Sequence, residues 1–281
     1  MDINYRSLKD TTLNDLTETF NSSFENYFVP LKLSEEQLRS KLKMDNTKLE
    51  LSIGAFHKDK LIGFILHGID DIDGKLTCYN GGTGVIEKYR GMKITSKMYS
   101  TILPIIKEAG VKKITLEVIS KNVNAIKVYE GIGFLNKRKV DSYKGSFPLK
   151  PNNDNWNVIS PKTIDLNKIK QYWTFIPTWQ STCGSLERQK ELLINYVVEH
   201  HNEIIGYLII NKLNGKVLQF AVKEAYRHQG IGTTLFQKAM LLKNDLMVYN
   251  VDERDMETRG FLKKNGMNYL LSQFEMELTL L

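Results

Sequence analysis

A short stretch near residue 230 combines the residue types that bind phosphate groups through the main chain. Arg227, Gly230 and Gly232 lie in the sequence Arg-His-Gln-Gly-Ile-Gly, between an apolar segment and a run with helical spacing. Consecutive backbone N–H groups at the start of a helix form a positive concavity, which the helix dipole strengthens. The two glycines carry no Cβ, so a phosphate can approach the backbone closely. The glycine spacing differs from the dinucleotide fingerprint and from the Walker loop, and it predicts another kind of anion site.

The same arrangement of residues occurs twice in the chain. Residues 85–95 and 222–232 are identical at five of eleven positions, with an offset of 137. Three further similarities follow the same order: residues 61–64 with 204–207, 28–30 with 175–177, and 133–134 with 266–267. Four similarities in one order indicate a duplicated domain, because the period of about 140 residues is too long for a solenoid repeat.

Each half shows the same order of expected elements around this turn. Helices are expected at residues 15–21, 34–42 and 185–193, and strand pairs at 51–56 with 61–66 and 194–199 with 204–210. A third extended segment (76–85; 217–222) leads into the turn, and a helix follows it, which Pro104 should kink or shorten in the first half. A strand at 113–118 and a helix at 122–130 come next. This order predicts an α/β class (α+β layered), with a central mixed, mostly antiparallel sheet flanked by helices in each half.

The length and the prolines predict where the chain divides. A chain of 281 residues is long for one domain, and three of its six prolines fall between residues 148 and 161. That turn-rich stretch is typical of a linker. The expected organisation is therefore a first domain at 1–147, a linker at 148–161 and a second, shorter domain at 162–281.

Composition excludes several classes of function. The net charge is +7, but basic and acidic residues alternate along the chain, and no arginine-rich tract is present. This pattern favours a small anionic ligand over nucleic acid. The longest apolar stretches are far shorter than the ~20 residues that cross a bilayer, and two cysteines are too few for a disulfide framework or a thiolate metal cluster. We expect a cytoplasmic protein that binds no nucleic acid, no membrane and no metal.

The motif Arg-x-x-Gly-x-Gly after Val-x-x-x-Tyr resembles the pyrophosphate-binding motif of the GCN5-related N-acetyltransferase (GNAT) superfamily. The first half adds that superfamily's second motif, in Leu116-Glu117-Val118, Asn122 to Ile126, Tyr129-Glu130 and Gly133-Phe134. The resemblance covers nearly the whole chain, as two GNAT-like domains in tandem.

The resemblance implies direct transfer of an acetyl group from acetyl-CoA, as co-substrate, to a primary amine. It also implies which residues contact the cofactor: Val85, Arg90, Gly91, Met92, Lys93, Ile94, Thr95 and Asn122 in the first copy, and Val222, Arg227, His228, Gln229, Gly230, Ile231 and Gly232 in the second. Tyr129 is implied to be the catalytic general acid, which donates its proton to the leaving sulfur, a role that suits a phenol protonated at neutral pH.

The two copies depart from the motifs in opposite ways. In the first, Lys93 and Thr95 replace the two glycines of the turn, whereas in the second Leu262 stands at the position of Tyr129. Leucine donates no proton, so we expect the first copy to be catalytic and the second to hold cofactor or serve a structural role. Asp255 stands at the position of Asn122.

The general base and the acceptor stay open at this point. Water, Glu25, His67 and Asp70 are candidates for the base, and each of the three residues also fits a surface or structural role. The acceptor is expected to be a small-molecule or peptide amine, and the protein a monomer or homodimer. An alternative is a catalytically silent acyl-CoA-binding sensor or interaction module. The aromatic segment 172–179 fits docking of the two domains better than an acceptor pocket.

Overall fold

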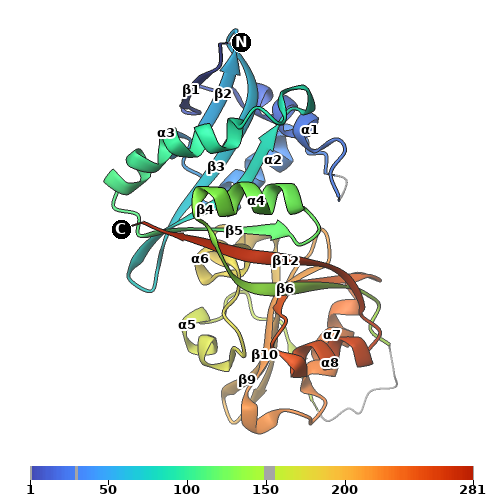
Figure 1. The fold of residues 1–281 in the computed structure, drawn as a ribbon. Helices are drawn as coiled ribbons and strands as arrows, with labels where there is room; N and C mark the ends of the chain where they lie inside the picture. Colours follow the sequence, from blue (N-terminus) through green and yellow to red (C-terminus); the bar gives the residue numbers. More distant parts are fainter. Residues whose placement is uncertain (1, 29–30, 149–155, 281) are drawn as a thin grey trace. The chain divides into compact units, whose positions relative to one another are not determined.

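The computed structural model describes residues 2–28, 31–148 and 156–280, and the chain forms two compact units (Figure 1). The first unit comprises Met1–Lys137 together with Glu275–Leu281, and the second comprises Arg138–Phe274. These boundaries differ from the ones expected from the sequence, because the end of the chain returns to the first unit. Half of the expected linker, residues 149–155, lies outside the described residues, and two of its described residues form the short strand β7 (Val158–Ile159).

The first unit contains a sheet with helices on both faces. Its elements are β1 (Asn4–Ser7), α1 (Leu13–Phe24), α2 (Glu35–Met44), β2 (Ile53–His57), β3 (Lys60–Ile72), β4 (Lys75–Val85), α3 (Ile94–Glu108), β5 (Lys113–Ile119) and α4 (Val123–Ile132). The strand order is β1-β2-β3-β4-β5, followed by the last part of β12 (Asn268–Thr279). Pairs from β1 to β4 are antiparallel, and β4 pairs with β5 in parallel.

Alternation along β3 places the helices on opposite faces of this sheet. Phe64 stacks on Phe20 of α1, with ring centroids 5.7 Å apart. A Cβ on the preceding residue, Gly63, would instead lie 3.6 Å from Ile94 of α3. Because successive strand residues point to opposite faces, α1 and α3 cover different sides. Helix α3 continues past Pro104 to Glu108, so the expected early end of this helix is wrong.

The second unit repeats this plan with shorter helices. Its elements are most of β6 (Leu135–Gly145), then β7, α5 (Leu166–Ile169), α6 (Cys183–Arg188), β8 (Leu193–His200), β9 (Glu203–Asn211), β10 (Lys216–Val222), α7 (Ile231–Met240), β11 (Leu246–Asp252) and α8 (Met256–Lys264). The strand order is β6-β11-β10-β9-β8-β7, and the first part of β12 lies beside β6. The helix expected at 185–193 ends earlier, at Arg188, and Leu193 already begins β8.

In both units the parallel strand pair separates towards the carboxyl ends of its strands. Among the described residues, β4 and β5 pair only from Thr77–Lys113 to Tyr79–Thr115, although β4 runs on to Val85. Strands β10 and β11 pair only at residues 216–217 with 247–248, although β10 continues to Val222. The separated ends expose a strand edge whose N–H and C=O groups can pair with an extended ligand.

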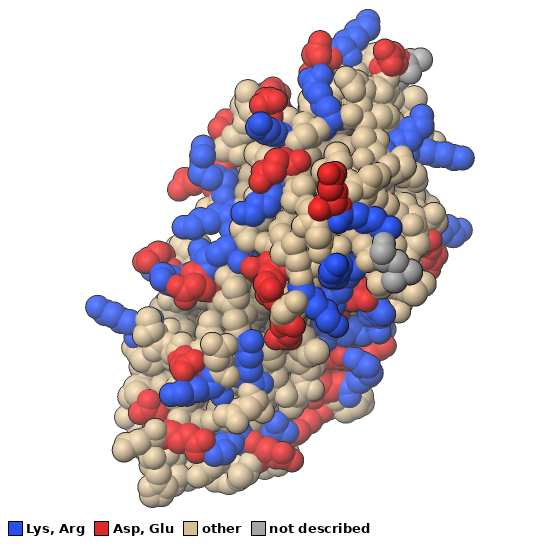
Figure 2. Space-filling view, turned by 90° about the vertical axis from the view of Figure 1, so that its left-hand side faces the viewer, with Lys and Arg blue, Asp and Glu red and all other residues tan. Residues whose placement is uncertain are grey.

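The surface carries charges of both signs. Figure 2 shows Lys and Arg side chains interspersed with Asp and Glu side chains over the face in view, without a continuous area of one sign. Among the described helices, none is long and apolar enough to cross a membrane. Within the described ranges, no group of three His, Cys, Asp or Glu residues is arranged to hold a metal ion.

Candidate functional site

The turns at residues 90–95 and 227–232 have left-handed residues at equivalent positions. In the first unit Gly91 and Lys93 adopt left-handed φ values of 79° and 57°, and in the second His228 and Gly230 adopt 62° and 89°. Each turn leads directly into a helix, α3 or α7. Lys93 therefore adopts the left-handed conformation that glycine adopts in the second turn. This conformation costs a non-glycine residue ~1–2 kcal/mol.

The arginine of each turn holds the end of the preceding strand. The guanidinium Nε of Arg90 donates to the Val85 carbonyl at 3.1 Å, and Nε of Arg227 donates to the Val222 carbonyl at the same distance. Arg90 also donates through Nη2 to the carbonyl of Ser23 at 2.9 Å. Through these contacts both arginines hold the turn against the end of the preceding strand.

The turn of the second unit opens into a cavity of about 670 Å³. Its walls are the end of β10, the turn, the start of α7 and one side of α8. Six of the seven cofactor residues expected in this copy line it: Val222, Arg227, His228, Gly230, Ile231 and Gly232. Gln229 is not among the lining residues. A Cβ at Gly232 would lie 3.1 Å from the ring of Phe261 in α8, so glycine here keeps two cavity walls close together.

A carboxylate, a guanidinium and an imidazole meet beside this turn. Glu257 on the first turn of α8 lies 3.3 Å from the guanidinium of Arg227 and 3.2 Å from Nε2 of His228. The indole N–H of Trp156 donates to the Gln229 carbonyl at 2.8 Å, which fixes the outer side of the turn. An anion that enters the cavity would compete with Glu257 for Arg227 and His228.

A second, smaller cavity of about 30 Å³ lies where β10 and β11 separate. It is lined by both strands and by the aromatic segment, through Trp173, Thr174 and Phe175. Thr174 and Phe220 line both cavities, so the two spaces adjoin. The aromatic segment expected to dock the domains thus lies within the second unit, where Tyr172 is part of the hydrophobic core.

In the first unit, Tyr129 lies on α4 with 8% of its surface exposed. The side chains of Asn80 and Thr83, near the end of β4, are hydrogen-bonded to each other at 2.8 Å. Burial raises the pKa of the Tyr129 phenol, and the neighbouring Thr83 and Asn80 side chains lower it. The ring meets that of Tyr99 edge to face, with centroids 6.5 Å apart. The phenol therefore keeps its proton at neutral pH and is held in one orientation.

Asn122 begins helix α4 as its N-cap. Its Oδ1 accepts a hydrogen bond from the backbone N–H of Ala125 at 3.2 Å. Burial raises the pKa of the Tyr27 phenol, and the neighbouring Asn122 side chain lowers it. Asp255 caps α8 in the same way and accepts from the N–H of Thr258 at 2.9 Å. The structure thus brings Asn122 and Tyr129 onto one helix beside the end of β4.

Glu117 is a candidate site residue that the sequence analysis did not select. It lies on β5 two positions after Thr115, the last residue paired with β4, and its Oε2 accepts a hydrogen bond of 2.6 Å from the Tyr79 hydroxyl. Burial, followed by the charges of Glu117 and Asp45, raises the pKa of Tyr79 well above its usual range. The sequence feature that could have identified Glu117 is that it is the single acidic residue in the apolar strand segment Leu116-Glu117-Val118.

The second unit lacks an acid at the corresponding position. The offset of 133 that relates Asn122 to Asp255 and Tyr129 to Leu262 places Asn250 opposite Glu117. The Asn250 Nδ2 donates to the hydroxyl of Thr178 at 2.9 Å, whereas its buried Oδ1 has no partner among the described residues. Asn250 also lines the smaller cavity.

The base candidates selected from the sequence lie elsewhere. His67 is fully buried, its Nδ1 lies 2.8 Å from the Leu51 carbonyl, and burial lowers its pKa to about 4. This is a structural histidine. Glu25 is exposed just after α1, and Asp70 lies partly buried on β3. Cys78 is fully buried, and burial raises the pKa of its thiol.

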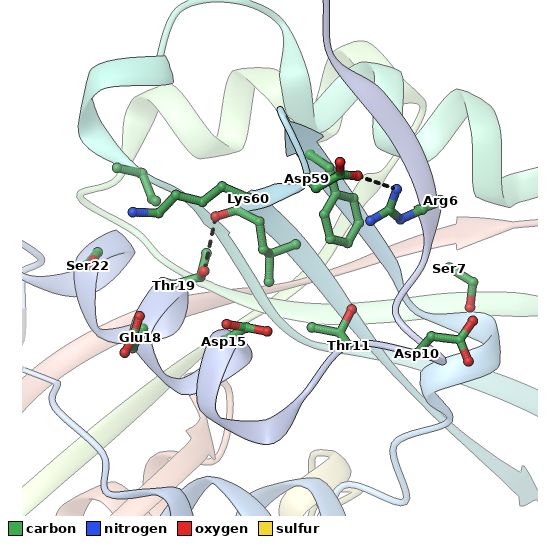
Figure 3. Close-up of a pocket in the computed structure, with 13 residues that line it drawn as sticks. Arg6, Ser7, Asp10, Thr11, Asp15, Glu18, Thr19, Ser22, Asp59 and Lys60 are labelled. Carbon is green, nitrogen blue, oxygen red and sulfur yellow. Dashed lines mark hydrogen bonds and ion pairs between the residues drawn. The ribbon is translucent and has the colours of Figure 1, made fainter.

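A third cavity, of about 230 Å³, lies between α1 and the β2–β3 turn (Figure 3). Its rim is polar, with Asp10, Asp15 and Glu18 on one side in this view. Arg6 and Asp59 form an ion pair of 3.3 Å across another part of the rim. None of the site residues expected from the sequence lines this cavity.

Comparisons with known proteins agree with this arrangement. Residues 12–134 match the model of the acetyltransferase (GNAT) family, and residues 193–266 match that of the acetyltransferase (GNAT) domain. N-alpha-acetyltransferase MAK3 of Arabidopsis thaliana is 30% identical over 94 residues, and N-alpha-acetyltransferase 30 of Schizosaccharomyces pombe is 30% identical over 95. Each match covers 34% of this chain, and 50% and 63% of those relatives respectively, so the chain spans less than two thirds of either one.

The fold of the whole chain also has a counterpart among solved structures. A tandem GNAT protein from the clavulanic acid biosynthesis pathway superposes with a TM-score of 0.74 at 11% sequence identity. The match covers 99% of this chain and 98% of that one. At this identity the likeness concerns the fold, and it shows the two domains in tandem.

Proposed function

The chain belongs to the GNAT acetyltransferase family, with two family domains in tandem, and we propose that its first unit transfers an acetyl group from acetyl-CoA to a primary amine. The observation that carries this proposal is the contrast between the units. The first contains a carboxylate and a phenol, Glu117 and Tyr129, where the second contains Asn250 and Leu262. Neither of the latter exchanges a proton at neutral pH.

Glu117 and Tyr129 would move the two protons of the reaction. As the amine nitrogen attacks the thioester carbonyl, a new C–N bond forms and the C–S bond breaks. Glu117, at the point where β4 and β5 separate, accepts the proton that the amine loses. Tyr129 gives its phenolic proton to the departing thiolate and regains one from solvent. Such general acid–base steps typically contribute ~10²–10⁴-fold each.

The residues of the first turn would hold the cofactor. The backbone N–H groups of Gly91 to Thr95 face the diphosphate, with the exposed Lys93 adding positive charge. The edge of β4 up to Val85 pairs with the pantetheine amides, and Asn122 supports the same arm. Arg90 keeps the strand end and the turn in register through its bond to Val85.

The second unit would bind a coenzyme A thioester without transferring the acyl group. Its turn keeps both glycines, and its cavity of about 670 Å³ is of the size that encloses small-molecule ligands. Val222, His228, Gln229 and Ile231 complete this proposed site around the turn. This assignment accounts for an open cofactor cavity beside a helix that lacks the proton donor.

The acceptor is proposed to be a primary amine of a peptide or small molecule. The names of the two curated relatives support an α-amine at a peptide terminus. Neither Cys78 nor Cys183 forms a disulfide in the described part of the chain, which supports the reducing cytoplasm as the place of the reaction.

Release of free coenzyme A thiol, measured with a panel of peptides, polyamines and amino acids, tests the proposal. We expect amine-dependent thiol release that Glu117→Gln and Tyr129→Phe each reduce, while Asn250→Ala in the second unit leaves it unchanged. Binding of acetyl-CoA without turnover on any amine would contradict the proposal and favour the acyl-CoA sensor.

A further inference from the structure

A carboxylate of α8 uses both of its oxygens on side chains of the second turn. Oε2 of Glu257 lies 3.3 Å from the guanidinium Nη1 of Arg227, and Oε1 lies 3.2 Å from Nε2 of His228. Glu257 and both partners line the cavity of about 670 Å³, together with Gly230 and Gly232 of the turn. A carboxylate of the protein itself therefore holds the side chains that an anion in this cavity would otherwise meet.

The corresponding positions of the first unit have other side chains. The offset of 133 places the exposed Asn124 at the position of Glu257, and the offset of 137 places Gly91 at that of His228. Arg90 donates through Nη2 to a backbone carbonyl, an uncharged partner, at 2.9 Å. The carboxylate that bridges two side chains of the turn is thus a feature of the second unit.

We propose that Glu257 is a built-in competitor for the diphosphate of coenzyme A, whose carboxylate holds Arg227 and His228 until the ligand displaces it. The inference rests on the proposed function, because it assumes that the second unit binds this cofactor. The Glu257 side chain is 47% exposed and that of His228 is 83% exposed, so solvent weakens their contact and the carboxylate can leave. A diphosphate carries more negative charge than one carboxylate, and it also gains the backbone N–H groups of the turn. Glu257 therefore sets the concentration of cofactor at which the second unit fills.

The tryptophans provide a readout that belongs to the second unit. All three, Trp156, Trp173 and Trp179, lie in that unit, and the indole N–H of Trp156 donates to the Gln229 carbonyl of the turn at 2.8 Å. Titration of the full chain with coenzyme A, followed by tryptophan fluorescence, therefore measures the affinity of the second site even when the first site also binds. Coenzyme A without an acyl group is the probe, so no transfer accompanies binding.

Two variants separate the competing carboxylate from the net charge of the protein. Glu257→Gln keeps the size of the side chain and removes its charge, so the second site should tighten about fivefold. Glu253→Gln is the matched control, because the Glu253 side chain is 42% exposed, pairs with Lys139 and is not among the residues that line the cavity. Its affinity should stay within about twofold of the wild type. The gain in Glu257→Gln should largely disappear in about 1 M salt, where the Debye length is about 3 Å.

A second site that weakens in Glu257→Gln would overturn the inference, because the carboxylate would then assist binding. Equal affinities of this variant and the wild type would overturn it as well, and so would the same tightening in Glu253→Gln. A titration signal that appears only in Glu257→Gln would support it. The absence of a signal in both proteins would refute the inference together with cofactor binding by the second unit, whereas a chain that binds coenzyme A but acetylates no amine refutes only the proposed transfer.

Discussion

The hydroxyl of Tyr79, in the last pair between β4 and β5, donates a 2.6 Å hydrogen bond to the carboxylate of Glu117, two residues beyond that pair on β5. Because the carboxylate accepts this bond, Tyr79 holds Glu117 in one orientation at the point where β4 and β5 separate. This is the carboxylate to which we assign the role of proton acceptor in the first unit.

Replacement of Glu117 by Gln should lower the rate of acetyl transfer about 10²–10⁴-fold, because the amide accepts no proton from the amine. Affinity for acetyl-CoA should stay within about twofold, since the proposed cofactor residues are untouched. Steady-state thiol release and calorimetry measure the two effects. Full activity of the Glu117→Gln variant would contradict this prediction and would indicate that water accepts the proton of the amine.

Replacement of Tyr129 by Phe should reduce turnover about 10²–10⁴-fold with little change in acetyl-CoA affinity, because only the proton donor is removed. Tyr99→Phe is the matched control, since Tyr99 shares the Asn80 network without touching the sulfur in the proposed arrangement. Its effect should be smaller by at least about tenfold. If Tyr129→Phe kept full activity while Gly230→Glu abolished it, the roles of the two units would be reversed.

The left-handed residues of the two turns predict opposite effects on stability. Lys93→Gly should stabilise the protein by about 1 kcal/mol, since glycine adopts a φ of 57° without steric penalty. Gly230→Lys, at a φ of 89° with open space around the Cβ position, should destabilise it by a similar amount. Urea unfolding measures both changes. Equal stability of Lys93→Gly and the wild type would show that another interaction of Lys93 offsets the strain.

Burial of His67 predicts a loss of stability in mild acid. Its pKa is about 4 in the folded protein and ~6.5 when unfolded, so between these values the unfolded chain binds more protons. Stability should therefore fall as the pH drops from 6.5 to 4, by at most about 3 kcal/mol from this group. His67→Phe should remove this part of the pH dependence, whereas His201→Asn, at an exposed turn, should not. An unchanged pH slope in His67→Phe would contradict the assignment.

The motif residues could be predicted from the sequence because their spacing is local. The turn at 227–232 and the helix that begins after Asn122 depend on residues close together in the chain, and the duplication is visible in four short similar segments. Glu117 was not selected, since its role depends on where β5 separates from β4 and on Tyr79, 38 positions away. The domain boundaries likewise depend on the pairing of the end of the chain with the first unit, and the positions of the prolines do not indicate this pairing.

The end of the chain pairs with β5 of the first unit. The backbone N–H of Leu280 donates to the Lys112 carbonyl at 2.8 Å, and Glu277 pairs with Lys113 at 2.9 Å. The sheet of the first unit therefore cannot be completed until the residues around position 280 have left the ribosome. A shortened gene product that ends before residue 275 would leave β5 as a bare edge, open to self-association.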